Sequence, residues 1–273
     1  VNNVAVASIS GVQERLRVLL VTGEPHAGAR AWRNLLKGDP SVDLVHFTIL
    51  RPPELQEFTP LDELALIAFP VRELFFERLA DFDLVVFDRF RQLSILPDIY
   101  FENVVDYVRN GGALLAAFGP EEAAGAGLLA TPIGRLLPVQ TTGNTSQTPF
   151  RPTIAPSGAA HPVTEGLAGA ESWGRWFRLI EADAMAGTVV MTGAGGRPLL
   201  VLDRAGEGRV AALLSDQVWL WARGFEGGGP FGELFRRTAH WLMQEPQLDE
   251  DRLTATSRDG RLVVCLLYTS RRG

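Results

Sequence analysis

The stretch LRVLLVTGEPHAG, at positions 16–28, constrains the fold more than any other part of the chain. Residues 18–21 are all apolar. An apolar run without a polar face is typical of a central strand in a parallel sheet, because helices cover both faces of such a sheet. The next segment, residues 26–37, is predicted to form a helix. Ligands of such sheets bind where strands end and helices begin, so Glu24 and His26 are expected at the rim of a site.

Composition places the chain among globular proteins with a sizeable core. Hydrophobic residues make up 46% of the 273 residues and charged residues 21%. The formal net charge of −6 argues against nucleic-acid binding, which needs a positively charged surface. No apolar run approaches the roughly 18 residues that span a bilayer, and no signal peptide is recognisable at the start. The single cysteine, Cys265, excludes an internal disulfide and cysteine-based zinc sites.

Strand-like and helix-like segments alternate over the first half of the chain. The alternation has a spacing of roughly 30 residues, which predicts a doubly wound parallel α/β sheet of the flavodoxin-like kind. The predicted elements are buried strands at 42–50, 83–90 and 113–118, an amphipathic helix at 71–82 with Leu74, Phe75, Leu79 and Phe82 on one face, and a helix at 97–109.

The second half has a different pattern, which predicts a late β-hairpin extension of the sheet. Short strands are expected at 173–181, 188–191, 198–203 and 209–215, with glycine-containing hairpin turns at 193–196 and 206–208. A helix at 231–243 ends the domain. The glycines at 193–196 lie between strands and open no helix, so they are no dinucleotide fingerprint, and no cofactor or metal is predicted.

Three regions follow from these patterns. Residues 1–14 are interpreted as the end of an upstream β domain, with a strand at 4–9, and a linker. Residues 15–247 form the α/β domain, including a long connection at 54–70 with a short helix at 61–67. Residues 248–273 are interpreted as a linker and a tail of uncertain origin, in which 261–267 is strand-like. Because the chain starts without Met, we expect it to be part of a longer protein.

Several motifs resemble the class I glutamine amidotransferase-like superfamily. They are GEPHAG after the first strand, FDRF at 87–90, the glycine pair before strand 113–118, and HPVTEGL at 161–167 followed by the hairpin at 206–210. The chain is most similar to the glutamine amidotransferase-like module of bacterial membrane-anchored proteins. Those proteins also carry a von Willebrand A-like domain and an upstream β-sandwich.

The resemblance has implications for fold, location and partners. It implies the flavodoxin-like fold of this superfamily. It also implies a full-length protein that is anchored in the membrane through segments outside this chain, with its soluble part on the periplasmic side. The expected partner is another protein or a neighbouring domain of the same polypeptide.

The catalytic positions of the superfamily are empty in this sequence. A glutaminase of this class places a cysteine on the turn after a central strand, where the thiolate is favoured. The matching turn reads Gly119-Pro-Glu-Glu and contains no Cys, Ser or Thr. The partner histidine would follow strand 209–215, but Asp216-Gln-Val stands there. Cys265 has no histidine near it in sequence, so the resemblance implies a fold without amidotransferase chemistry.

Polar residues lie at or just beyond the carboxyl ends of three predicted parallel strands and are expected at one edge of the sheet. Such carboxylates with one histidine can hold a hard divalent ion or act as acid and base. Alternatively, they cap helices and pair with arginines. These residues are Glu24, His26, Asp88, Arg89 and Glu121. His161 is a further base candidate, although a structural role beside Pro162 is the simpler interpretation.

Aromatic residues and an arginine precede the glycines at 227–229. Trp219, Trp221, Arg223 and Phe225 suit a partner surface or a pocket lid. The alternative is that the tryptophans pack against the open edge of the sheet. With Glu24, His26 and Arg89 they make up the predicted ligand- or partner-binding residues.

Two functions follow from these alternatives, and a purely structural spacer is the third interpretation. The leading hypothesis is a non-catalytic binding or interaction module that lacks the Cys-His-Glu triad. The rival is a hydrolase whose site consists of carboxylates and histidines at the carboxyl ends of the strands: Glu24, His26, Asp88, Glu121 and His161.

Overall fold

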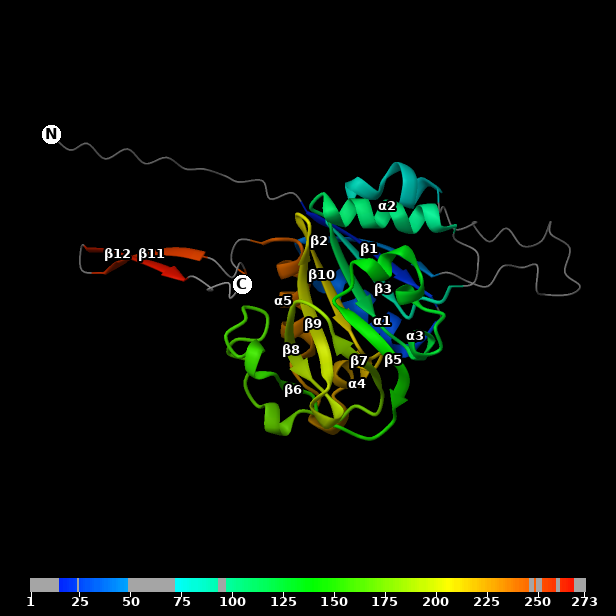
Figure 1. Cartoon of the computed structure of the whole chain (residues 1–273). Helices are drawn as coiled ribbons and strands as arrows, with labels where there is room; N and C mark the ends of the chain where they lie inside the picture. The colour runs from blue at the N-terminus through cyan, green and yellow to red at the C-terminus, as the bar shows by residue number, and fades with distance from the viewer. Residues whose placement is uncertain are drawn as a thin grey trace, which may run out of the picture.

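In a computed structural model, the chain folds around one eight-stranded mixed sheet with the strand order β2-β1-β3-β4-β10-β9-β8-β6 (Figure 1). The structure describes residues 15–23, 25–48, 72–92, 97–245 and 248, and the backbone of 252–258 and 261–267. The predicted strand at 4–9, the connection at 54–70 with its helix at 61–67, and Glu24 lie outside the described residues.

Five parallel strands make up one half of the sheet, as the alternation of elements predicts. β1 is buried from Val18 to Thr22 because it pairs on both sides, with β2 and β3. The predicted burial of strand 42–50 is wrong for its described part: β2 is the edge strand, and only its first residue is buried. The five strands are β1 (Leu16–Thr22), β2 (Val42–Thr48), β3 (Leu84–Asp88), β4 (Ala113–Ala117) and β10 (Gly208–Leu213).

Three antiparallel strands extend the sheet beyond β10, which agrees with the predicted hairpin extension. The turns at 193–196 and 206–208 lie where the glycines indicated. The strand predicted at 173–181 begins later and belongs to a separate two-stranded sheet, so this prediction was only partly right. The extension consists of β9 (Pro198–Ala205), β8 (Thr188–Thr192) and β6 (Thr153–Ile154); the separate sheet pairs β5 (Val139–Ser146) with β7 (Leu179–Ala184).

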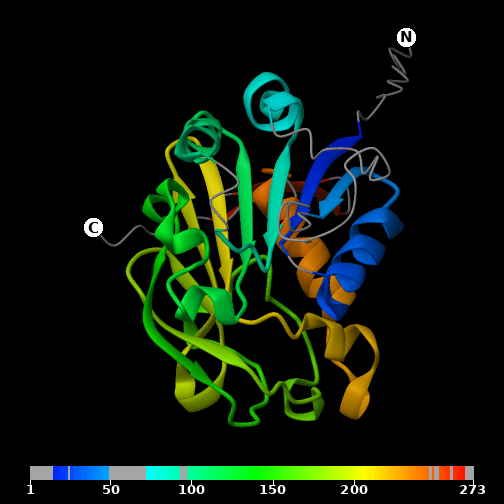
Figure 2. The ribbon, with the colours of Figure 1, turned by 90° about the vertical axis from the view of Figure 1, so that its right-hand side faces the viewer.

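The face of the sheet on which a helix lies depends on the direction in which its connection runs along the sheet. The β1–β2 and β3–β4 connections run in opposite directions along the sheet, so right-handed crossovers place α1 and α2 on opposite faces. α1 lies beside α5 (Figure 2). Trp32 of α1 and Phe235 of α5 meet edge to face at 5.0 Å between ring centroids. The helices are α1 (Ala27–Gly38), α2 (Asp98–Arg109), α3 (Pro120–Ala123), α4 (Val218–Ala222) and α5 (Phe231–Leu242).

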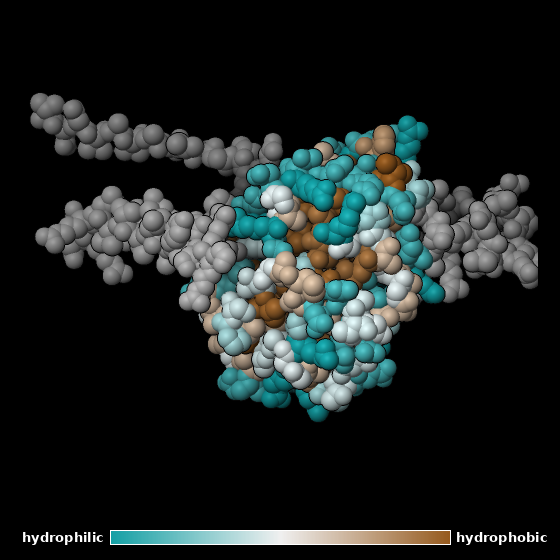
Figure 3. Space-filling model, viewed as in Figure 1, coloured by the Kyte–Doolittle hydropathy of each residue, from teal (hydrophilic) through white to brown (hydrophobic). Residues whose placement is uncertain are grey.

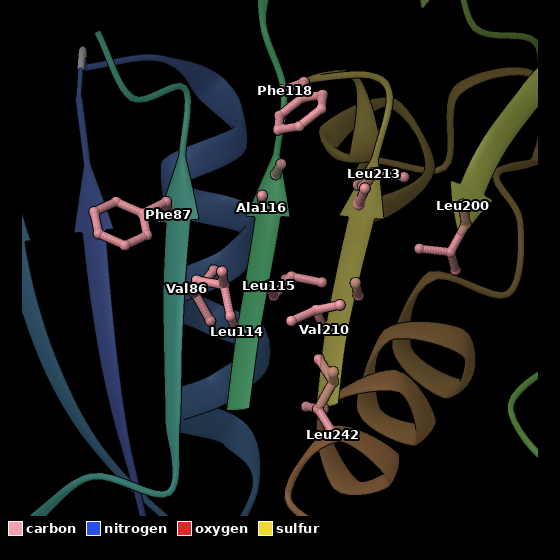
Figure 4. Packing of buried hydrophobic residues seen from close by; sticks show 14 of the residues in the cluster. Val86, Phe87, Leu114, Leu115, Ala116, Phe118, Leu200, Val210, Leu213 and Leu242 are labelled. Carbon is pink, nitrogen blue, oxygen red and sulfur yellow. The ribbon is translucent and has the colours of Figure 1, made fainter. Parts of the chain in front are cut away.

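The hydrophobic core lies between these helices and the sheet. Side chains of β3, β4 and β10 fill its centre, and Leu242 of α5 lies near Val210 of β10 (Figure 4). The 3₁₀ turns that connect these elements are η4 (Leu128–Ala130), η5 (Pro132–Arg135), η6 (Pro156–Gly158), η7 (Ala170–Ser172), η8 (Ala194–Gly196) and η9 (Phe225–Gly227).

The predicted helix at 71–82 is wrong as a continuous helix. Its described part is a π-helical turn, η2 (Glu73–Glu77), followed by a 3₁₀ turn, η3 (Leu79–Asp81). The break lies at Arg78, whose φ of −126° is not helical. The four apolar residues of the predicted face are nevertheless all buried. Two short turns therefore bury the side chains that one amphipathic helix would bury.

The tail contains one hairpin beyond the α/β domain. β11 (Arg252–Arg258) and β12 (Arg261–Leu267) pair antiparallel and form a sheet of their own. β12 coincides with the predicted strand at 261–267, whereas β11 was not predicted. Within the described residues, no helix is long and apolar enough to cross a membrane.

Candidate functional site

Polar side chains from several elements meet at the carboxyl ends of the parallel strands. We call this group the carboxyl-edge cluster. The edge position was predicted for four of the members, because the carboxyl ends of parallel strands share one edge. Its members are His26 before α1, Asp88 and Arg89 at the end of β3, Glu121 of α3, Asp216 after β10 and Arg178 before β7.

His26 is held by hydrogen bonds at both ring nitrogens. It is the N-cap residue of α1, and its Nδ1 accepts a hydrogen bond from the backbone N–H of Gly28 at 3.1 Å. Its Nε2 lies 2.7 Å from Oδ2 of Asp88. Because Nδ1 accepts a hydrogen bond, the ring proton is on Nε2, which donates a hydrogen bond to Asp88. A Cβ at Gly28 would lie 2.4 Å from the His26 ring, so only glycine fits beside it.

Asp88 is the most deeply buried carboxylate of the cluster. Its side chain is fully buried. Burial raises the pKa of Asp88 above its ordinary value, although the hydrogen bond from His26 acts in the opposite direction. The negative charge of Asp216 raises this pKa further. The ionised form of Asp88 is therefore stabilised by its contacts alone, above all by the hydrogen bond from His26.

Arg89 connects two of the acidic groups. It has a φ of +49°, a left-handed backbone conformation that is uncommon for residues other than glycine. Its guanidinium pairs with the Glu121 carboxylate, and its Nε lies 3.7 Å from Oδ2 of Asp216. The arginine side chain thus reaches from the end of β3 to carboxylates that follow β4 and β10. The same side chain lies close to Gly119, the N-cap residue of α3 just after β4.

Asp216 belongs to this cluster and was not among the predicted site residues. It is buried, and its Oδ2 accepts a hydrogen bond from Arg178 at 2.8 Å. The sequence held a sign of Asp216, because this residue directly follows the predicted strand at 209–215 and so lies at a strand end, as Asp88 does. Arg178 gave no such signal, since it comes from a segment outside the parallel part of the sheet.

The charges of the cluster nearly balance. Three carboxylates face two guanidinium groups and one histidine. One oxygen on each carboxylate, Oδ1 of Asp88, Oε2 of Glu121 and Oδ1 of Asp216, is buried and has no hydrogen-bond partner among the described residues. The described residues contain no group of three or more His, Cys, Asp or Glu side chains that could hold a metal ion. The arrangement is that of a paired ionic network.

His161, the other candidate base, has a structural environment. Its Nδ1 accepts a hydrogen bond from the backbone N–H of Val163 at 3.2 Å. Its ring packs on Trp241 of α5 at 5.4 Å between centroids. These contacts indicate that His161 has a structural role, which is to hold the HPVTEGL loop against α5.

Only some of the side chains of the segment 219–225 are accessible to solvent. Trp221, predicted to bind a ligand or partner, is instead buried between Trp173 and Trp176, and its Nε1 donates to the Gly174 carbonyl at 2.7 Å. Leu220 is buried as well. Three other side chains of the segment reach solvent: Trp219 is half-buried, Arg223 lies over its ring at 5.2 Å, and Phe225 is 40% exposed.

Comparison with solved structures supports the fold assignment. The sequence matches no protein-family model, and no curated protein matches it. A cytoplasmic protein from Salmonella typhimurium LT2 superposes with a TM-score of 0.61 at 16% identity, over 83% of this chain and 99% of its own. A second cytoplasmic protein from Salmonella typhimurium gives 0.59 at 21% identity, over 83% and 99%.

A ThuA-like protein from Bacteroides uniformis superposes with a TM-score of 0.52 at 11% identity, over 85% of this chain and 93% of its own. ThuA-like proteins have a class I glutamine amidotransferase-like fold. The fold resemblance stated from the motifs is thus supported. At these identities the likeness extends to the fold alone.

Proposed function

We propose that this chain is a non-catalytic binding module built on a glutamine amidotransferase-like fold. The observation that carries the proposal is the environment of Gly119, at the turn where the superfamily places its nucleophile. A Cβ at Gly119 would lie 2.3 Å from Oε2 of Glu121 and 2.8 Å from Nε of Arg89. The Arg89–Glu121 ion pair thus occupies the space that a nucleophilic side chain needs.

The rival hydrolase hypothesis draws on the His26–Asp88 pair, because an aspartate beside a histidine is a common general-base arrangement. In this protein both ring nitrogens of His26 are already engaged, one with Gly28 and one with Asp88. A base needs a free nitrogen that faces the substrate. The pair therefore favours a structural role for His26.

The partner that we propose is a neighbouring domain of a longer, membrane-anchored polypeptide, as the resemblance to the von Willebrand A-associated module implies. The exposed part of segment 219–225 is the surface proposed to receive it. Phe225 packs edge to face on Phe177 at 5.7 Å, which makes an aromatic surface beside Arg223. Aromatic residues and arginine are enriched at protein interfaces.

We expect no release of ammonia from glutamine by this protein above the buffer background. The reason is that no nucleophile stands at the turn after β4 and that an ion pair fills this position. The measurement is a coupled ammonia assay with a working glutaminase as positive control. The Cys265→Ser variant serves as the matched control. Release by the wild type that is lost in Cys265→Ser would overturn the proposal and make the tail cysteine catalytic.

The partner proposal has a separate test. Amide hydrogen exchange at residues 219–228 is compared between this chain and the longer native polypeptide. We expect slower exchange in the longer protein, because a docked domain shields these amides from solvent. Equal exchange in both would exclude the neighbouring-domain partner and leave the ammonia result unaffected.

A further inference from the structure

A cavity lies at the opposite end of the sheet from the carboxyl-edge cluster. Its volume is about 540 Å³, within the range of small-molecule sites. η2, η3, the last turns of α2 and the residues just after α5 form its walls. Asp83 before β3 and Gly112 before β4 place it at the amino ends of the strands. We call it the amino-end cavity.

The wall of this cavity is pre-formed around Tyr107. The Tyr107 hydroxyl donates to the Phe82 carbonyl at 3.0 Å and accepts from the Ala113 N–H at 3.2 Å. The backbone of Gly112 presses on the same ring, since a Cβ there would lie 2.3 Å from it. The tyrosine is therefore fixed by contacts at both its hydroxyl and its face. A fixed wall lowers the ordering cost of binding a ligand.

All the charged side chains among the described residues of the cavity wall are acidic. They are Glu77, Asp83 and Asp106, and none of the described lining residues is Lys, Arg or His. Glu77 pairs with Arg72, and Asp83 accepts the backbone N–H of Arg17. In the described part of the chain, the Asp106 carboxylate makes no ion pair or side-chain hydrogen bond. The cavity thus offers at least one carboxylate to an incoming cation.

Apolar surface lies directly beside these carboxylates. Phe76 is 60% exposed and lines the cavity, and Ile99 at the start of α2 is 54% exposed. Figure 3 shows apolar surface at the upper right, where η2 and α2 lie in Figure 1. A smaller cavity of about 200 Å³ is lined by Phe76, Ile99 and Tyr100, together with Arg72. Exposed apolar surface of this kind next to a cavity is typical of binding sites.

The lining favours a cation with an apolar body. Phe82, which lines the cavity, already makes a cation–π contact, because the Arg17 guanidinium lies 5.2 Å from the centroid of its ring. We propose that the amino-end cavity binds a small organic ammonium that carries an aryl or alkyl group. The ammonium lies between the Asp106 and Asp83 carboxylates, and the apolar group packs on Phe76. This site is independent of the function proposed above.

The probe for this proposal is 2-phenylethylammonium, and 3-phenylpropionate is the matched anion of similar shape. Binding is followed by the backbone amide shifts of residues 107–112 during titration of the whole protein. We expect saturable shifts with the cation and binding of the anion at least about tenfold weaker, because like charges repel at the wall. Equal binding of both probes, or shifts confined to the carboxyl-edge cluster, would overturn the proposal.

Two pairs of variants separate the charge from the apolar surface. Asp106→Asn is expected to weaken cation binding about fivefold, while Asp98→Asn, on the same helix but outside the cavity, stays within about twofold. Phe76→Ala is expected to weaken it by a similar factor, and the equally exposed Met185→Ala leaves it unchanged. All four positions are exposed, so each variant is expected to fold. Cation binding that survives both Asp106→Asn and Phe76→Ala would place the ligand elsewhere.

Discussion

Replacement of His26 by alanine is expected to lower the free energy of unfolding by about 3–5 kcal/mol. The main reason is that the variant leaves Asp88, which is fully buried, without its hydrogen-bond donor at 2.7 Å. Loss of the N-cap of α1 contributes about 1 kcal/mol of this sum. The measurement is urea denaturation at pH 7, followed by circular dichroism and tryptophan fluorescence.

The Asp88→Asn background tests whether the stranded charge carries the effect. With a neutral amide at position 88, His26→Ala is expected to cost only about 1 kcal/mol, which is the capping contribution. The difference between the two backgrounds is the coupling energy of the pair. An equal cost of His26→Ala in both backgrounds would show that the histidine acts through the cap alone.

The stability of the protein is expected to decrease as the pH rises from about 4.5 to about 7, because of Glu122. Burial raises the pKa of Glu122 from 4.5 to about 7, against the hydrogen bonds that its carboxylate accepts from Leu129 and Leu128. In this window the folded state holds a proton that the unfolded state has released. The unfolded state binds fewer protons, so the free energy of unfolding falls with pH. At about 1.4 kcal/mol for each pKa unit, the loss amounts to about 3 kcal/mol.

The Glu122→Gln variant isolates this contribution. Glutamine cannot lose a proton, so the variant is expected to lack the decrease attributable to Glu122. It also loses one of two backbone hydrogen bonds, a cost of about 1 kcal/mol at pH 4.5. The free energy of unfolding is measured for both proteins at half-unit steps from pH 4.5 to 8, with Glu165→Gln, at an exposed position, as control. A wild type and variant whose curves stay parallel would contradict the prediction.

The parallel core could be predicted from the sequence because its signals are local. Residues 18–21 are apolar on both faces, and only a strand with two neighbours and two covered faces buries all of them. The hairpins at 193–196 and 206–208 carry their own glycines, so their turns were also predictable. The edge position of Asp88 followed from the same rule, since a residue at the end of a parallel strand reaches one known edge.

Other features depended on contacts between distant segments. The described part of 71–82 has helical periodicity, yet it forms two turns with a non-helical Arg78 between them, and its apolar residues stay buried. Trp221 has the same local sequence signal as its exposed neighbours. Its burial depends on Trp173 and Trp176, which lie more than forty positions away.

The sequence by itself determined the class of fold, the edge at which polar residues gather and the lack of a nucleophile after β4. These follow from periodicity, turn residues and residue identity, which are properties of neighbouring positions. Only the tertiary structure decided that Asp216 and Arg178 join the cluster, that both nitrogens of His26 are occupied, and that a cavity forms at the amino ends of the strands. Pairing of charges and enclosure of space require side chains from separate elements at defined distances, and those distances exist only in the folded chain.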